Sequence, residues 1–141
     1  RLPTTGERVI VSPTLVGGIV LFTSFVPVND ICKSSGDSYL YALFYLTGSA
    51  PKDPVIGTTT SGGNTNVNRS VSLGTGSGVA SQESVHLGSQ ATGASGSGTA
   101  GGGCQAGSTS FIQTSTGTLN SQCTRIDGAR SKYISWINLR S

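Results

Sequence analysis

Charged residues, histidine, tryptophan and methionine are scarce in this chain. Asp, Glu, Lys and Arg make up 11% of the 141 residues, and there is one histidine, one tryptophan and no methionine. This low charge, together with 35% hydrophobic residues, excludes the highly charged class of disordered protein. No apolar run reaches the about 18 residues that a membrane-spanning helix needs. We therefore expect a folded domain that does not span a membrane.

Few side chains in this sequence could bind a metal ion. The cysteines, Cys32, Cys104 and Cys123, lack the C-x-x-C spacing of a zinc site, and the single histidine, His86, is isolated from them. We therefore predict no metal and no cofactor. In a chain rich in Ser, Thr and Gly, the cysteines favour one disulfide formed in an oxidising compartment, with one thiol left over. Two pairings fit this expectation, Cys104 with Cys123 and Cys32 with Cys104.

Candidate catalytic groups are equally few. His86 with Cys104 or Cys123 is the only pairing of a nucleophile with a base that the sequence offers, and no G-x-S-x-G motif occurs. Residues 96–101 fit the pattern G-x-G-x-x-G, but no apolar strand precedes them and no helix is expected after them. We therefore predict that the chain is not an enzyme.

Basic residues raise the net charge to +3, and several of them lie near the C-terminus beside Tyr133 and Trp136. Nucleic-acid sites combine cations with aromatic rings in this way. Alternate solvated positions on a final strand explain the same pattern more simply. We therefore predict no nucleic-acid partner.

Glycine, serine and threonine dominate what remains. The chain contains 21 glycines, and a composition of this kind favours strands and turns over helices. We predict an all-β fold. The composition changes after residue 56 to Gly, Ser, Thr and Asn. We therefore expect a segment 1–56 and a segment 57–141, the second with long Gly/Ser/Thr-rich loops and a closing C-terminal strand, joined in one structural unit.

Alternating and β-branched residues predict the individual strands. In the first segment they are expected at 7–11, 14–16, 19–26 and 39–46, with Gly17-Gly18 as a hairpin turn between the second and third. In the second segment they are expected at 67–73, 79–87, 108–117 and 131–140.

The run at 39–46 is apolar on both of its faces. Tyr39 and Leu43 fall on one face and Phe44 on the other. A strand of this kind belongs in the centre of a structure that covers it on two sides. We predict that these three residues, together with Trp136 and Ile137 of the terminal strand, form the core or an assembly contact.

Five pieces of the sequence resemble, in this order, the C-terminal blades of PilY-type proteins, the tip adhesins and biogenesis factors of bacterial type IV pili. They are LPTTGERVIVSPTLVGGIVLFTSFVPVNDIC, GDSYLYALFYLTG, GSGVASQESVHLG, FIQTSTG and SWINL. The resemblance implies one or two antiparallel blades of an incomplete β-propeller. It also implies an exported bacterial protein at the cell surface or on the pilus. The first residue is Arg, not Met, which we interpret as a piece of a longer precursor.

Two ligand features attributed to some PilY-type relatives do not carry over to this sequence. The aspartates are scattered and form no D-x-D-x-D-G calcium loop. No Arg-Gly-Asp triplet occurs, and the nearest text is Arg125-Ile126-Asp127-Gly128. Calcium control and integrin binding are therefore not implied for this chain.

An excised pair of blades would leave an apolar face and several strand edges uncovered. We therefore expect a structural or adhesive module that either docks in the rest of its PilY-type parent or assembles head to tail into a filament by strand complementation. Such a contact would also order the Gly/Ser/Thr-rich residues 91–110. The alternative is a carbohydrate- or surface-binding module that uses the exposed aromatics Tyr133 and Trp136.

Overall fold

The computed structural model describes residues 2–28, 35–87, 108–124 and 126. Within these ranges the chain forms nine strands and no helix, which confirms the all-β prediction. The strands are β1 (Thr14–Val16), β2 (Ile19–Pro27), β3 (Gly36–Phe44), β4 (Thr58–Ser61), β5 (Asn64–Val67), β6 (Ser70–Ser72), β7 (Ser84–Leu87), β8 (Ser108–Gln113) and β9 (Leu119–Thr124). None of the described segments is a helix of the length and apolarity that crossing a bilayer requires.

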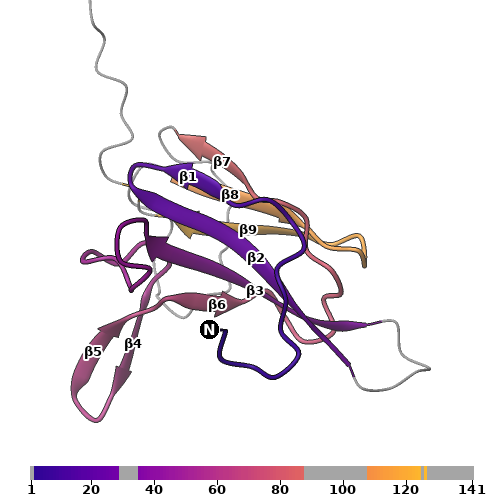
Figure 1. Ribbon diagram of the computed structural model, residues 1–141, viewed down its shortest axis with the longest axis horizontal. Helices are drawn as coiled ribbons and strands as arrows, with labels where there is room; N and C mark the ends of the chain where they lie inside the picture. Colours follow the sequence, from indigo (N-terminus) through magenta and orange to yellow (C-terminus); the bar gives the residue numbers. More distant parts are fainter. Residues whose placement is uncertain (1, 29–34, 88–107, 125, 127–141) are drawn as a thin grey trace, which may run out of the picture.

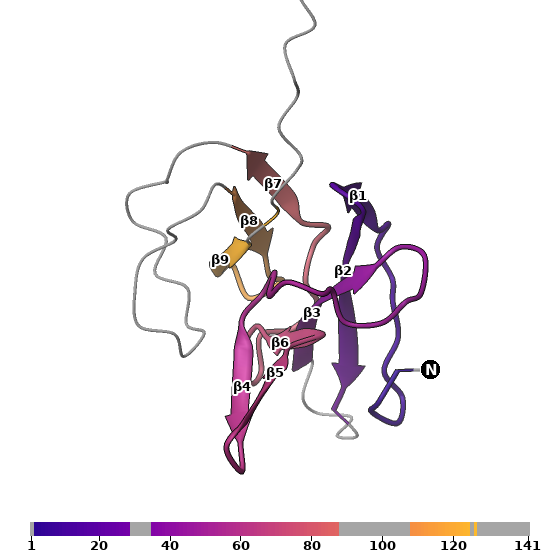
Figure 2. The same cartoon turned by 90° about the vertical axis from the view of Figure 1, so that its left-hand side faces the viewer.

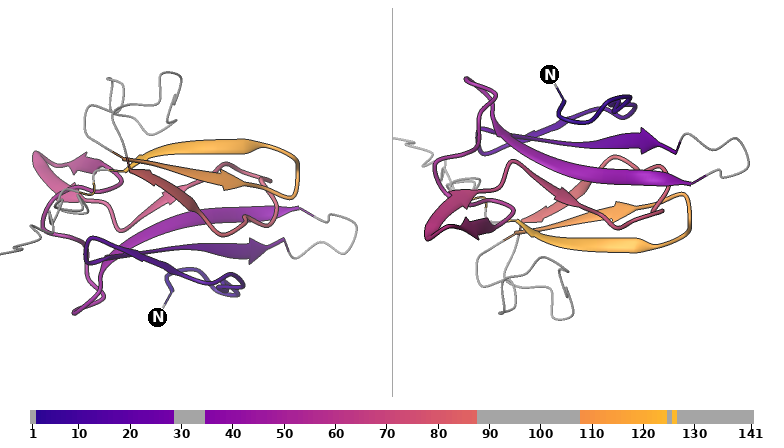
Figure 3. Two further views of the ribbon diagram at one scale, coloured as in Figure 1. Left: turned by 90° about the horizontal axis from the view of Figure 1, so that it is seen from above. Right: turned by 90° about the horizontal axis from the view of Figure 1, so that it is seen from below.

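Seven of these strands form two antiparallel sheets that lie face to face (Figures 1 and 3). The first sheet has the order β1-β2-β3-β6 and the second the order β7-β8-β9. The remaining two strands, β4 and β5, form a separate hairpin that projects from the sandwich (Figure 2). Antiparallel sheets bury one face each in such an arrangement, so the space between the sheets is where the core must lie.

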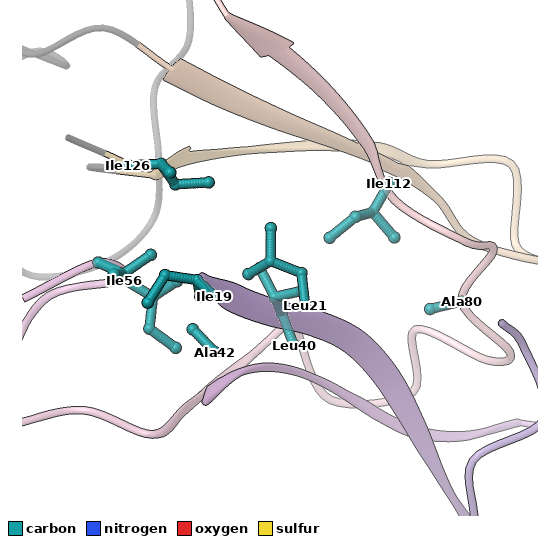
Figure 4. Packing of buried hydrophobic residues seen from close by; sticks show 9 residues of the cluster. Ile19, Leu21, Leu40, Ala42, Ile56, Ala80, Ile112 and Ile126 are labelled. Carbon is teal, nitrogen blue, oxygen red and sulfur yellow. The ribbon is translucent and has the colours of Figure 1, made fainter. Parts of the chain in front are cut away.

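The hydrophobic core lies between the two sheets (Figure 4). Leu21 of β2, Leu40 of β3 and Ile112 of β8 are fully buried and point toward one another. The other buried members come from both strands and connections, and they are Ile19, Ala42, Val55, Ile56, Ala80 and Ile126. The core thus contains residues from both of the segments that composition distinguished at residue 56.

The two-residue hairpin predicted at Gly17-Gly18 is confirmed. Both glycines have positive φ, 58° and 80°, which is the backbone that a tight hairpin with twisted strands requires. Gly62-Gly63 repeats this geometry, with φ of 58° and 81°, and joins β4 to β5. No strand is predicted there from the sequence, because threonine and asparagine replace the apolar alternation by which strands are recognised.

The strand predicted at 7–11 is wrong. This segment pairs with β2 only at the isolated bridge between Arg8 and Phe25. Regular pairing resumes at Thr14, after Pro13, whose nitrogen carries no hydrogen for a sheet ladder. Between these points the chain leaves β2, and the Val9 and Ile10 side chains are 42% and 53% exposed.

The central strand predicted at 39–46 exists but is shifted toward the N-terminus. It is β3, which begins at Gly36 and ends at Phe44, where the chain turns. The expected burial on both faces holds only in its middle, where Leu40 is fully buried on one face and Tyr41 is 6% exposed on the other. Leu43, on the outer face, is only half-buried.

The second segment is less regular than predicted. The strand expected at 67–73 shortens to β6, the one at 79–87 to β7 with an isolated bridge between Ala80 and Thr114, and the one at 108–117 to β8. β9 is not predicted from the sequence, since LNSQCT lacks the usual β-forming residues. The terminal strand expected at 131–140, with Trp136 and Ile137, lies outside the described residues, as do residues 91–107 of the Gly/Ser/Thr-rich stretch.

The predicted propeller blades are not confirmed. The first sheet has four antiparallel strands, the number in a propeller blade. However, the second sheet packs across its inner face as in a sandwich, and the described strands do not form a ring (Figure 3).

Candidate interaction surface

The outer face of the first sheet carries a row of apolar side chains. Side chains alternate between the two faces of a strand, so burial of Leu21 and Leu40 in the core places their neighbours outside. Strand register aligns Leu15 with Val20 and Val20 with Leu43, so these three residues cross β1, β2 and β3 in one line. A sheet face of this composition is typical of a contact surface.

Aromatic residues extend this row along the strands. Phe22 and Tyr41 face each other across β2 and β3, and their rings are stacked with centroids 5.0 Å apart. At the opposite end, the Tyr45 backbone N–H donates to Gly18 O at 3.1 Å, which sets Tyr45 beside the first hairpin turn. The outer face therefore runs from Tyr45 through the apolar row to the stacked pair.

Glu7 fastens the N-terminal segment over one half of this face. Its Oε1 accepts hydrogen bonds from Ser24 Oγ at 2.5 Å and from the Tyr41 hydroxyl at 2.7 Å, and its Oε2 accepts from the Thr4 N–H at 3.1 Å. Burial acts to raise the pKa of Glu7, but the donors Ser24, Tyr41 and Thr4 outweigh it and hold that pKa below its usual value. Burial, together with the hydrogen bond to Glu7, raises the pKa of Tyr41. The charged carboxylate is thus the form that fastens the segment.

The other half of the outer face is not covered by the described residues. Leu15 is 62% exposed, Tyr45 is 54% exposed, and Val20 and Leu43 are half-buried. We call these four residues the outer patch. Exposed apolar residues that adjoin in this way are unusual on a surface that faces only water.

An unpaired strand edge adjoins the outer patch. Because Val16 and Ile19 flank a two-residue turn, they form a hydrogen-bonded pair, and the next pair, Leu15 with Val20, does not exchange hydrogen bonds. The N–H and C=O of Leu15 therefore point away from β2, toward the open side of the sheet. An added strand could pair there while its side chains contact the outer patch.

The residues predicted for the core or an assembly contact separate in the structure. Tyr39 and Leu43 lie on the outer face of β3, with Leu43 in the outer patch, whereas Phe44 faces inward and packs against the core. Trp136 and Ile137 lie outside the described residues. The sequence did not single out Leu15, Val20 and Tyr45, because side-chain alternation separates the two faces of a strand but does not show which face is left uncovered.

Cys123 of β9 is disulfide-bonded. This excludes the alternative in which Cys32 pairs with Cys104, because Cys123 then occupies one of those two cysteines. Both possible partners lie outside the described residues. Since Cys123 is oxidised, it cannot serve as the nucleophile that the sequence pairs with His86, whose side chain is exposed on β7.

Other sites in the described residues are weaker. A shallow pocket of about 340 Å³ is lined by Leu2, Pro3, Thr4, Thr5 and Arg69, and its one charged group, the Arg69 guanidinium, belongs to an exposed residue. Within residues 2–28, 35–87, 108–124 and 126, no three His, Cys, Asp or Glu side chains lie close enough together to form a metal site.

Replacing Glu7 with glutamine is expected to lower the stability of the chain by about 1 kcal/mol at neutral pH, because an amide accepts hydrogen bonds less strongly than a carboxylate. The folded-state pKa of Glu7 lies below its ordinary 4.5, so this stabilisation is present above that pH and is lost as the pH falls through the lowered pKa. Urea unfolding of both proteins across the acid range measures the difference. Asp53→Asn, at an exposed acid, is the control, and a difference that persists at the lowest pH would contradict the role of the charge.

No protein-family model, no curated protein and no solved structure matches this chain.

Proposed function

We propose that this chain is an extracellular structural or adhesive module of the PilY type, and that the outer patch is the surface by which it attaches to the rest of a pilus protein or to another copy of itself. Its role is non-enzymatic and its location is the cell surface or pilus. Support for the PilY type comes from the five ordered sequence pieces. Support for attachment comes from the outer patch.

The uncovered outer patch is the observation on which this proposal depends. Leu15 and Tyr45 expose more than half of their surface, and half-buried Val20 and Leu43 lie between them. Burying apolar surface contributes about 25 cal/mol per Å², so a partner that covered these side chains would gain binding energy without new polar contacts. The inner face of the same sheet is occupied by the second sheet, so within the described chain the outer face is the one that this sheet can offer to a partner.

Propeller architecture gives a specific version of this contact. A blade is a four-stranded antiparallel sheet whose two faces are covered by neighbouring layers. β1, β2, β3 and β6 provide such a sheet, with the β7-β8-β9 sheet on one side. In this version the outer patch meets the preceding blade of the parent protein.

Self-assembly is the second state of the same module. The open edge at Leu15 offers a donor and an acceptor, and the apolar row lies next to it. A neighbouring copy that added a strand there would make a head-to-tail contact, and contacts of that kind propagate into filaments unless they close into a ring.

Exchanging Leu15 and Tyr45 together for lysine is expected to weaken association by at least tenfold, because two charges would have to lose water at the contact. Sedimentation velocity of the chain alone, and in mixtures with the separately produced remainder of the proposed PilY-type parent, measures that association. Leu119→Lys is the matched control, since Leu119 is 66% exposed but lies at the start of β9, in the other sheet. Equal association of the double variant and the wild type would eliminate the outer patch as the contact.

A second candidate function is carbohydrate binding, which the exposed ring of Tyr45 favours. Tyr45 is 54% exposed, and its ring makes a T-shaped contact with the Phe44 ring, with centroids 5.3 Å apart, so the ring has a neighbour that holds it while much of the residue is accessible to a sugar. In this case Tyr45→Ala would abolish glycan binding while Leu15→Lys would leave it intact, which separates the two candidates.

A further inference from the structure

A carboxyl group without a partner lies inside the sandwich. Glu83 is 4% exposed, and neither of its side-chain oxygens has a hydrogen-bond partner among the described residues. Buried carboxylates in proteins are normally paired with a cation or with several donors, because an unpaired buried charge is very costly. Glu83 therefore requires an explanation that the proposed contact surface does not provide.

Glu83 belongs to a short connection, residues 81–83, that joins the two sheets. The Thr23 hydroxyl of β2 donates to Ser81 O at 3.1 Å, while Ser81 N–H donates to Gln113 O of β8 at 2.8 Å. The Gln82 amide donates to Thr14 Oγ1 of β1 at 3.3 Å. The connection thus contacts β1 and β2 in the first sheet and β8 in the second.

A bulge turns the Glu83 side chain inward. Between the paired positions Ala80–Thr114 and Ser84–Phe111 there are three residues on the connection but only two on β8. Beyond the bulge the alternation is regular, since Ser84 is exposed and Val85 packs against the core. Glu83 therefore lies on the same inner face as Val85.

The inner face of the second sheet contains two more polar groups without partners. Ser110 Oγ of β8 and Asn120 Nδ2 of β9 are buried and make no hydrogen bond within the described chain. Strand register places Ser110 opposite Val85, and Asn120 opposite Ile112, so both lie on the same face as Glu83. The surroundings are polar enough to tolerate a neutral carboxylic acid, but these groups do not solvate a carboxylate.

No cation faces Glu83 from the elements that pack around it. The sequences of β1, β2, β8 and β9 contain no Lys, Arg, His, Asp or Glu. The ionisable residue on β7 is His86, whose exposed side chain projects from the opposite face. Thr14 approaches the carboxyl without a hydrogen bond of acceptable geometry. Ionisation of Glu83 would therefore leave a charge that no group of the described strands compensates.

We propose that Glu83 is a proton-operated latch between the two sheets. With a proton on its carboxyl, residues 81–83 stay between the sheets and hold β7 on the edge of β8. When the proton passes to solvent, the carboxylate draws residues 81–83 toward water, β7 separates, and the edge of β8 becomes available for pairing. This latch does not depend on the proposed attachment through the outer patch.

The direction of the pH effect follows from burial. Burial raises the pKa of Glu83 above its usual value of 4.5, and its own backbone and the polar groups of Thr14 offset only part of the rise. The folded state therefore holds a proton that the unfolded state has released. The stability that this bound proton contributes is fully present below about pH 4.5 and is lost as the pH rises through the raised pKa of Glu83. This pH dependence is the reverse of the one expected for Glu7.

The test compares the wild-type chain with Glu83→Gln, which keeps the shape and cannot ionise. Urea unfolding gives the folding equilibrium constant of each protein. The constant of the variant divided by that of the wild type is expected to rise by up to tenfold for each pH unit above 4.5, until the pH passes the raised pKa of Glu83. Over the same range, hydrogen exchange of the β7 amides, corrected for intrinsic rates, is expected to accelerate in the wild type only. A ratio that does not vary with pH would overturn the latch.

A direct titration keeps the test decisive if Glu83→Gln does not fold. Carbon-13 NMR of the Glu83 carboxyl in the wild-type chain should show a midpoint above the ordinary 4.5. A midpoint at or below that value, or β7 amides whose protection does not change across the transition, would show that the carboxyl does not control the position of β7.

Discussion

Replacing Leu40 with alanine is expected to lower the free energy of unfolding by about 2–5 kcal/mol. Leu40 has no exposed surface and lies in β3 between Thr23 of β2 and Val71 of β6. Its side chain points into the space between the sheets, toward Ile112 (Figure 4). The two sheets cannot easily collapse onto the cavity that the change would leave, because strand pairing fixes the backbone on either side.

Two other leucines of the same region provide matched comparisons. Leu43→Ala is expected to cost less than Leu40→Ala, because Leu43 is half-buried on the outer face. Leu46→Ala should change stability by no more than about 0.5 kcal/mol, since this side chain is 68% exposed. Chemical denaturation of the three variants measures the order. If Leu43→Ala were the most damaging, the outer face would be the principal core and the arrangement of the two sheets would be wrong.

Replacing Cys123 with serine is expected to lower the free energy of unfolding by about 2–5 kcal/mol, because it removes the disulfide bond of Cys123, the one cysteine among the described residues. The bond ties β9, an edge strand of the second sheet, to a cysteine outside the described residues. Without the bond, the unfolded chain can adopt more conformations, so its entropy rises, whereas the entropy of the folded state does not. Urea unfolding under reducing and oxidising conditions measures this change, and the reduced wild type and the variant should have similar free energies of unfolding.

Thiol counting and peptide mapping complete that experiment. The denatured, unreduced wild type should contain one free thiol per chain and Cys123→Ser two, if the released partner stays reduced. Mapping identifies whether the partner is Cys104, in which case the bond closes a loop of about twenty residues and contributes roughly 3 kcal/mol, or Cys32, in which case the loop is longer and the contribution larger. Three free thiols in the wild type would contradict both the bond and the oxidising compartment.

Local sequence was sufficient where neighbouring residues decide the structure. Gly17-Gly18 predicts its hairpin because two consecutive residues with positive φ are inexpensive only for glycine. The alternation within residues 39–46 likewise assigned the side chains of β3 to two faces, and the scarcity of helix-forming residues predicted an all-β chain. β4 and β5 were missed although Gly62-Gly63 carries the same turn signal, because their side chains are all polar or nearly so.

Which face of a strand is covered was decided by partners far away in the sequence. Leu40 and Leu43 are both leucines of β3, yet Leu40 is fully buried and Leu43 only half-buried, because the second sheet covers the inner face while Glu7 fastens the N-terminal segment over only part of the outer face. Periodicity specifies the two faces of a strand but not what lies against each of them.

The sequence by itself determined that the chain is β-rich, where its first hairpin turns, and which side chains share a face, since these depend on backbone preferences within a few residues. Only the tertiary structure decided the outer patch and the burial of Glu83. From sequence, a glutamate beside Ser84 is expected at the surface, where its charge is solvated. It lies inside because a bulge in residues 81–83 turns its side chain between two sheets whose packing brings together strands from both halves of the chain.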